Sequence, residues 1–159
     1  GAPEGWYEVR QGTLSWREPS ASETHHVGIT LQDAADLRAI PDCKVFVSAA
    51  DCDGREIVST APLSLMWGTQ FYYYGANLSF PQGATSCTLS VRSESPGFAR
   101  RTKDLGGFFT RPVSFCWQGV ELPRPGRESG EQGRVPMTGD FGEGRHPAMI
   151  PTPYPGSVR

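Results

Sequence analysis

The chain has 159 residues, a formal net charge of −2, and 19 glycines and 14 prolines. Its near-neutral charge, with no basic cluster longer than residues 100–103, argues against a nucleic-acid partner. No apolar run approaches the roughly 18 residues that span a bilayer, so we expect no transmembrane segment. The start at Gly1-Ala2-Pro3 shows no signal peptide and is typical of a processed chain.

The N-terminal third of the chain alternates between apolar and polar residues. One or two short antiparallel strands are predicted over residues 1–20, which contain Trp6, Tyr7, Val9, Leu14 and Trp16. Residues 25–32 have the period of a half-buried strand, with His25 towards the apolar face and His26 on the opposite face. A loop is expected from there to Asp42.

The middle of the chain predicts further strands separated by turns. Residues 43–50 form one strand, and Asp51-Cys52-Asp53-Gly54 is a hairpin signal. We expect Pro62 to break the returning strand before residues 63–66 resume it. The aromatic run that follows, ending at Gly75, is interpreted as a core strand with a bulge or a close backbone approach. Two more strands are expected around Leu89 and over residues 112–120, with a long loop at 93–111.

Seven or so short strands with turn signals between them predict an all-β fold, an immunoglobulin-like antiparallel β-sandwich over residues 1–120. The composition changes in residues 121–159, where 14 of 39 positions are Gly or Pro. This segment lacks the apolar residues to form its own core, so we expect an extended tail that docks on a partner. Its candidate anchors for partner binding are Phe141, Met149, Ile150 and Tyr154.

The four cysteines are Cys43, Cys52, Cys87 and Cys116, and none belongs to a Cys-x-x-Cys pair. An even count in a small Gly/Pro-rich domain suggests two disulfides and an oxidising compartment, whereas buried free thiols would fit a cytosolic protein. The strand between Cys43 and Cys52 would hold them roughly 27–30 Å apart. A disulfide between these two is therefore disfavoured, and Cys87–Cys116 is disfavoured with it if all four pair.

Three stretches, read together, are similar to a known family. They are residues 23–29, then Met66 with the Tyr-Gly-Ala-Asn turn that ends at Asn77, and finally residues 98–102 with 107–112. Their order and spacing resemble the periplasmic iron-transport proteins, which include copper-binding partners of bacterial ferrous-iron permeases and a treponemal lactoferrin-binding lipoprotein. The resemblance covers roughly residues 20–120. It implies an immunoglobulin-like sandwich in the bacterial envelope, often a homodimer, with a metal site of methionine, histidines and an acid near the dimer contact.

Only two ligand positions of that family carry over to this chain, namely Met66 and His26. Gly28 stands where the family has its acid, and Tyr73 and Arg101 stand at or near two histidine positions. Copper or ferrous iron needs about four donors, and an arginine is a permanent cation that repels a metal ion. We therefore interpret His26 and Met66 as the remnant of a metal site, and we expect no cofactor.

No catalytic signature is present in a usable context, so an enzyme is not expected. The favoured hypothesis is a non-catalytic periplasmic accessory subunit, peripheral to the membrane, that docks through its tail onto protein subunits of a larger membrane complex. An electron-transfer or photosynthetic complex is one candidate host. The alternative is a periplasmic protein that binds copper or iron and assists a ferrous-iron permease.

Overall fold

The computed structural model of the protein describes residues 1–123 and the backbone of residues 149–153. The strands are β1 (Trp6–Arg10), β2 (Thr13–Arg17), β3 (His25–Asp33), β4 (Val45–Ala50), β5 (Glu56–Trp67), β6 (Tyr72–Leu78), β7 (Ser86–Ser93), β8 (Val113–Glu121) and β9 (Met149–Pro153). A single 3₁₀ turn, η1 (Lys103–Leu105), is the one helical element in these residues. Seven strands form an antiparallel sheet in the order β8-β7-β4-β5-β6-β3-β9, and β1 and β2 form a separate pair.

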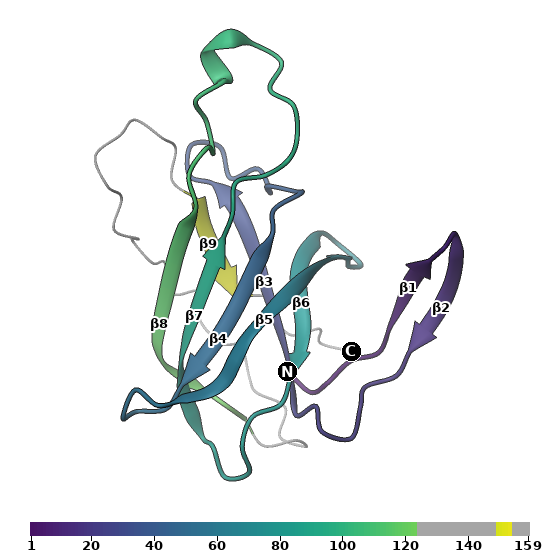
Figure 1. Cartoon of the computed structure of the whole chain (residues 1–159), viewed down its shortest axis with the longest axis vertical. Coiled ribbons are helices and arrows are strands. Elements are labelled where there is room, and N and C mark those ends of the chain that lie inside the picture. The colour runs from purple at the N-terminus through teal and green to yellow at the C-terminus, as the bar shows by residue number, and fades with distance from the viewer. Residues whose placement is uncertain (124–148, 154–159) are drawn as a thin grey trace.

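The large sheet curls because β5 has two different neighbours along its length (Figure 1). Its first part pairs with β4 as far as Leu63, and its second part pairs with β6 from Ser64 onward. The prediction that Pro62 breaks this strand was wrong. Pro62 lies opposite Phe46 within β5. A proline gives no N–H to a ladder, and this one stands two residues before the strand takes its new neighbour.

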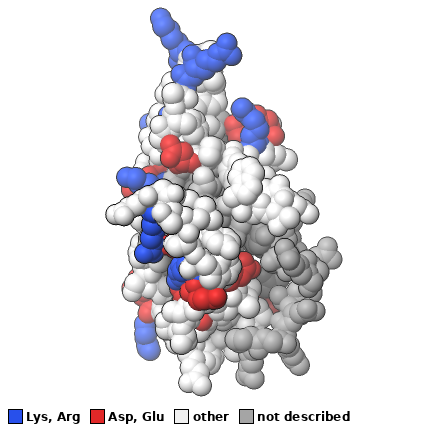
Figure 2. Space-filling view, turned by 90° about the vertical axis from the view of Figure 1, so that its right-hand side faces the viewer, with Lys and Arg blue, Asp and Glu red and all other residues white. Residues whose placement is uncertain are grey.

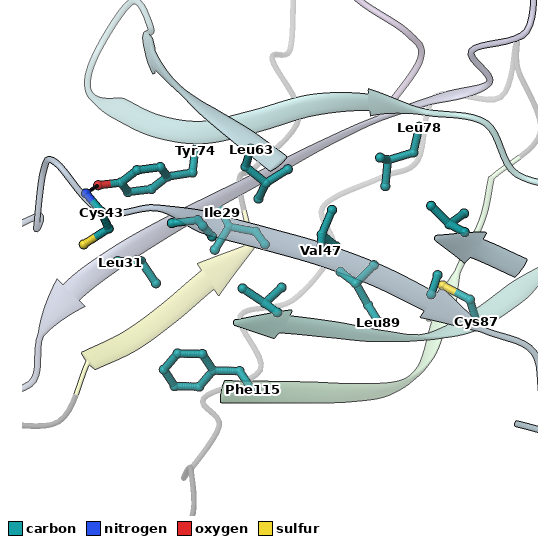
Figure 3. Close-up of a cluster of buried hydrophobic side chains, with 14 of the residues drawn as sticks. Ile29, Leu31, Cys43, Val47, Leu63, Tyr74, Leu78, Cys87, Leu89 and Phe115 are labelled. Atoms are coloured by element: carbon teal, nitrogen blue, oxygen red, sulfur yellow. Dashed lines mark hydrogen bonds between the residues drawn. The ribbon is translucent and has the colours of Figure 1, made fainter. Parts of the chain in front are cut away.

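The core lies between the two halves of the curled sheet (Figure 3). Alternate residues of β4 and of β7 are buried, as expected for strands with one face on a core. They pack against Ile29 and Leu31 of β3 and Tyr74 of β6. The Tyr74 hydroxyl donates to the Ile40 carbonyl (2.8 Å) and accepts from the Cys43 amide (3.0 Å). The predicted all-β sandwich is confirmed.

We had expected the aromatic run to form a core strand, but only part of it is buried. Tyr73 and Tyr74 are buried in β6, but Trp67 is 90% exposed and Phe71 is 36% exposed. The turn between β5 and β6 falls inside the run, where the Gly68 amide donates to the Phe71 carbonyl (3.0 Å). Trp67 and Phe71 flank this turn and are therefore exposed, whereas Tyr73 and Tyr74 lie further along β6 and are buried.

The β1–β2 pair lies outside the sandwich and projects from one side of it (Figure 1). The two short strands predicted for residues 1–20 are thus confirmed, but they do not join the main sheet. Gln11 and Gly12 form the tight turn between them with positive φ angles of 51° and 76°. Glycine adopts this left-handed conformation without steric cost.

The sandwich continues past the predicted boundary at residue 120. Leu122 is buried in the core, and its amide donates to the Thr85 carbonyl (2.8 Å). Beyond it, the backbone of Met149–Pro153 forms β9 and pairs antiparallel with β3, with Leu31 opposite Pro151. This part of the predicted tail is extended, as expected, and its backbone lies along a strand of its own chain.

The predicted disulfides are wrong, because all four cysteines are free. Cys43 and Cys52 flank opposite ends of β4, and Cys52 sits exposed in the hairpin turn that follows. On β7 and β8, Cys87 faces the core whereas Cys116 lies opposite Ser90 on the outer face. Cys87 and Cys116 therefore lie on opposite faces of the sheet. The support that disulfides would have given to an oxidising compartment is withdrawn.

Candidate functional site

The predicted site residues His26 and Met66 come together on the outer face of β5, β6 and β3. The strand register sets His26 opposite Asn77, Gly28 opposite Gly75, and Met66 opposite Tyr73. Because side chains alternate along a strand, these positions share one face. The opposite face of the same strands carries core residues such as Tyr74 and Leu78. The two residues carried over from the resemblance therefore lie on strands β3 and β5, one on each side of β6.

Gly75 is the point at which the site residues converge. A Cβ atom at this position would lie 2.7 Å from Cε2 of Tyr73, 3.0 Å from Nε2 of His26 and 3.1 Å from Sδ of Met66. The first distance is shorter than real Cβ contacts allow, so no larger residue fits without displacing its neighbours. The sequence predicted a bulge or a close backbone approach at Gly75. The register of β6 shows no shift there, and the groups that approach Gly75 are the side chains of Tyr73, His26 and Met66.

Hydrogen bonds fix the ring of His26 on both sides. Its Nδ1 lies 2.9 Å from the side-chain oxygen of Asn77. The Asn77 amide nitrogen donates to the Glu4 carbonyl and to the Glu23 carboxylate, so the oxygen must be the acceptor towards His26. Nδ1 of His26 consequently carries a proton. In the neutral ring Nε2 is then the acceptor, and it faces the Tyr73 hydroxyl at 3.3 Å.

The N-terminal segment covers His26, which is only 5% exposed. Gly1 and His26 exchange backbone hydrogen bonds of 3.1 and 3.0 Å. The Trp6 ring meets the imidazole edge-on at 6.2 Å, and the Arg17 guanidinium stacks on Trp6 at 4.2 Å. Arg17 is in turn bound to Glu23, and this bond is the main reason that the pKa of Glu23 is lowered. Trp6 and Arg17, at the base of the β1–β2 hairpin, thus cover the site.

The other residues at the family's ligand positions do not add an acidic or imidazole metal ligand beside His26. Gly28 has no side chain, and Tyr73 contributes a phenol where the family has an imidazole. Arg101 lies in the loop between β7 and β8, at the end of the sandwich where β3 finishes (Figure 1). His26 is near the start of β3, and its distance from Asp33 along the strand is roughly 23 Å. Within the described residues no three His, Cys, Asp or Glu side chains gather as a metal-binding group.

His25 faces the core, as predicted, and belongs to a different environment from His26. Its Nε2 lies 3.0 Å from the Pro123 carbonyl, and its Nδ1 lies 2.9 Å from the Thr24 hydroxyl. The carbonyl can only accept, so Nε2 carries the proton. Burial lowers the pKa of His25 below its ordinary value, because the charged ring would lose its hydration. This histidine ties the end of β8 to β3 and is unavailable to the His26 site.

The anchors predicted in the tail lie at the limits of the described structure. Met149 and Ile150 are the first two residues of β9, of which only the backbone is described. Phe141 and Tyr154 lie outside the described residues. Binding of a partner by these four side chains therefore stays a prediction.

Sequence reasoning missed Trp6, Arg17 and Asn77 as parts of the site. Asn77 was noted only as the end of a turn, and Trp6 only as a strand residue. The signal for Asn77 was its place in β6 at the same parity as Tyr73 and Gly75. Nothing in the sequence links Trp6 or Arg17 to residues 26–77, because that contact depends on how the hairpin folds back.

Comparison with known proteins returned no matching family model, no matching curated protein and no matching solved structure. The class of protein that the geometry defines is an all-β sandwich with a roofed His–Met–Tyr cluster on its outer face. Within the described residues, no helix has the length and hydrophobicity that crossing a membrane requires.

Proposed function

We propose that this protein is a non-catalytic accessory subunit in the bacterial envelope, on the periplasmic side, bound to a larger membrane-associated complex. The observation that carries the proposal is that other side chains of the protein occupy both ring nitrogens of His26. Nδ1 is bound to Asn77, Nε2 faces Tyr73, and Trp6 covers the ring. A histidine held in this way acts as a structural clamp for the N-terminal segment.

The chemistry of the neighbouring side chains supports this reading. Acidic or additional imidazole donors would be needed to complete a site for copper or iron. The residues at the corresponding positions are a glycine, a phenol and a distant arginine. The surface offers large exposed apolar side chains instead, including Trp67 and Trp16. Exposed aromatic residues of this kind are typical of surfaces that bind other proteins.

The test is affinity purification of the tagged full-length chain from native membranes, combined with metal analysis of the purified material. We expect a reproducible set of membrane-complex subunits in fixed ratio and less than stoichiometric copper or iron on this chain. An electron-transfer or photosynthetic complex is one candidate host. Recovery of the chain alone, or with a ferrous-iron permease and one metal ion per chain, would overturn the proposal.

One observation favours a second candidate function, a copper- or iron-binding protein that assists a ferrous-iron permease. The unprotonated Nε2 of His26 and the Sδ of Met66 both border the space above Gly75. Thioether and imidazole together suit Cu(I) better than Fe(II), because sulfur is a soft donor. This pair is the part of the site that a metal titration addresses.

A further inference from the structure

The β1–β2 hairpin presents one face that is entirely apolar. The register sets Tyr7 opposite Trp16 and Val9 opposite Leu14, so the four side chains share that face. Their exposed fractions are 65% for Tyr7, 50% for Trp16, 70% for Val9 and 63% for Leu14. The rings of Tyr7 and Trp16 meet edge-on at 4.9 Å. A contiguous patch of this composition is unusual on a protein surface that contacts only water.

The other face of the hairpin is polar and is fixed to the sandwich. Trp6 donates to Glu8 (3.2 Å), Arg10 binds Glu8 (2.6 Å), and Arg17 stacks on Trp6. Through Arg17 this face is bound to Glu23, which also accepts from the Asn77 side chain. The hairpin is therefore held at its base in one orientation, and its apolar face is turned away from these contacts.

A two-stranded hairpin of ten strand residues has little stability of its own in water. In the described residues β1 and β2 pair only with each other. Burying Tyr7, Val9, Leu14 and Trp16 against a partner would add the apolar contact that the hairpin lacks. The contacts at its base hold the hairpin in one orientation, so less orientational freedom is lost when a partner binds.

The charges around the hairpin indicate the partner's chemistry. Glu8, Arg10 and Arg17 lie on the polar face, where they form ion pairs, and Glu23 is bound to Arg17. Glu18 borders the apolar face directly, since its carboxylate accepts from the Trp16 ring nitrogen at 2.6 Å. Figure 2 shows Lys and Arg side chains at the upper end of the molecule, where the β7–β8 loop lies in Figure 1, and not beside the hairpin's apolar face.

We propose that the apolar face of the β1–β2 hairpin binds an apolar patch on another protein that is bordered by lysine or arginine residues. The carboxylate of Glu18 at the edge of this face disfavours an anionic lipid surface and favours a basic residue on the partner. Aromatic anchors surrounded by complementary charge are typical of specific protein interfaces. This inference names the surface through which the proposed accessory subunit would bind its complex, and it rests on the proposed function for where the partner is found.

The test is site-specific photocrosslinking in whole cells that express the full chain. p-Benzoylphenylalanine is placed at Val9, on the apolar face, and in a matched variant at Thr13, on the opposite face of the same hairpin. We expect the Val9 probe to give one dominant protein adduct, at least about tenfold above the Thr13 probe. Peptide mapping should place the adduct in an apolar segment flanked by Lys or Arg.

Other adducts would overturn the inference. They are a lipid adduct, a link to a second copy, a link within the same chain, and equal yields from Val9 and Thr13. Because the experiment uses whole cells, it identifies the protein that binds the hairpin even if the chain proves not to belong to a membrane complex. Failure of the proposed function and failure of this inference therefore give different results.

A second experiment measures how much binding depends on the face. Tyr7→Ser with Trp16→Ser, and separately Glu18→Lys, should each reduce recovery of the crosslinked partner with the tagged chain by about tenfold. Leu105→Ser is the control, because Leu105 is also an exposed apolar residue (40%) but lies in η1, outside the β1–β2 hairpin. Circular dichroism establishes that each variant is folded. Undiminished recovery by a folded Glu18→Lys variant and a folded double variant would contradict the proposal.

Discussion

At the scale of single residues, the most informative arrangement is the cluster around Gly75. An imidazole, a thioether and a phenol ring all approach the one position on β6 that has no side chain. His26 and Met66 were singled out by the family resemblance, and crowding at Gly75 was expected from its place in the aromatic run, but the side chains that crowd it were not predicted. The proton on Nδ1 of His26 was not predictable, because it follows from the two hydrogen bonds that orient Asn77.

Replacing Gly75 by alanine should disturb the whole cluster. The new Cβ would overlap the Tyr73 ring and press on His26 and Met66, so we expect a loss of about 1–3 kcal/mol in the free energy of unfolding. Urea denaturation of the Gly75→Ala variant measures it. Gly107→Ala is the matched control, because nothing lies within 4 Å of a Cβ there. Equal stabilities of the two variants would show that the cluster is loosely packed.

The metal-binding capacity of the cluster is predicted to be weak. Two donors, Nε2 of His26 and Sδ of Met66, should bind Cu(I), Cu(II) and Fe(II) less tightly than micromolar. A third donor supplied by Tyr73→His should raise Cu(I) affinity by about tenfold or more, because this position already faces Nε2. Competition titration and calorimetry on tag-free protein measure both.

Arg101→His is the control for that titration. It adds an imidazole at the far end of the sandwich, so it should leave the affinity of a single chain unchanged. Of the two positions at or near which the family has a histidine, only that of Tyr73 lies beside His26. A stoichiometric tight site in the unaltered protein, lost in Met66→Ala and His26→Ala, would make metal binding the primary function.

At the scale of elements, the alternation of apolar and polar residues predicted where most strands lie, but not which strands pair with one another. β4 and β7 follow the alternating pattern closely, because each has one face on the core. In β3 the alternation is interrupted, because His26 and Thr30 on the outer face are buried as well. The errors fall where tertiary contacts decide. Pro62 is accommodated inside β5 as it changes neighbours, Trp67 is exposed by a turn, and β9 pairs with β3 across more than 110 residues of sequence.

Truncation separates the last core residues from the tail. A chain ending after Pro123 retains Leu122 and the carbonyl that binds His25, so it should fold. A chain ending after Glu121 loses both and should be less stable than the first by about 2–3 kcal/mol. Urea denaturation compares them. Equal stability would mean that the core ends at residue 120, as the sequence had suggested.

At the scale of the whole molecule, the free thiols distinguish the two faces of the sandwich. Cys52 and Cys116 are exposed, whereas burial raises the pKa of Cys43 and of Cys87. Counting cysteines predicted two disulfides because sequence does not reveal which face each one occupies. Strand spacing did exclude a Cys43–Cys52 pair, since β4 separates them.

Thiol labelling of the folded protein should therefore proceed in two stages. Two of the four cysteines, Cys52 and Cys116, should react rapidly with a thiol reagent, and Cys43 and Cys87 should react only after unfolding. Mass spectrometry of labelled peptides under non-reducing conditions assigns each site. Any native disulfide, or rapid labelling of Cys87, would contradict the packing of β7 against the core.

The prolines of β9 also determine how far the sheet can grow. Pro151 and Pro153 have the same parity in a strand that forms one edge, so both missing N–H groups fall on one side of it. A ladder with β3 needs N–H donors, so the side that lacks them is the one turned away from β3. Another strand arriving at that edge would find too few donors to pair with. The segment that completes the sheet thus also terminates it, which guards the molecule against edge-to-edge aggregation.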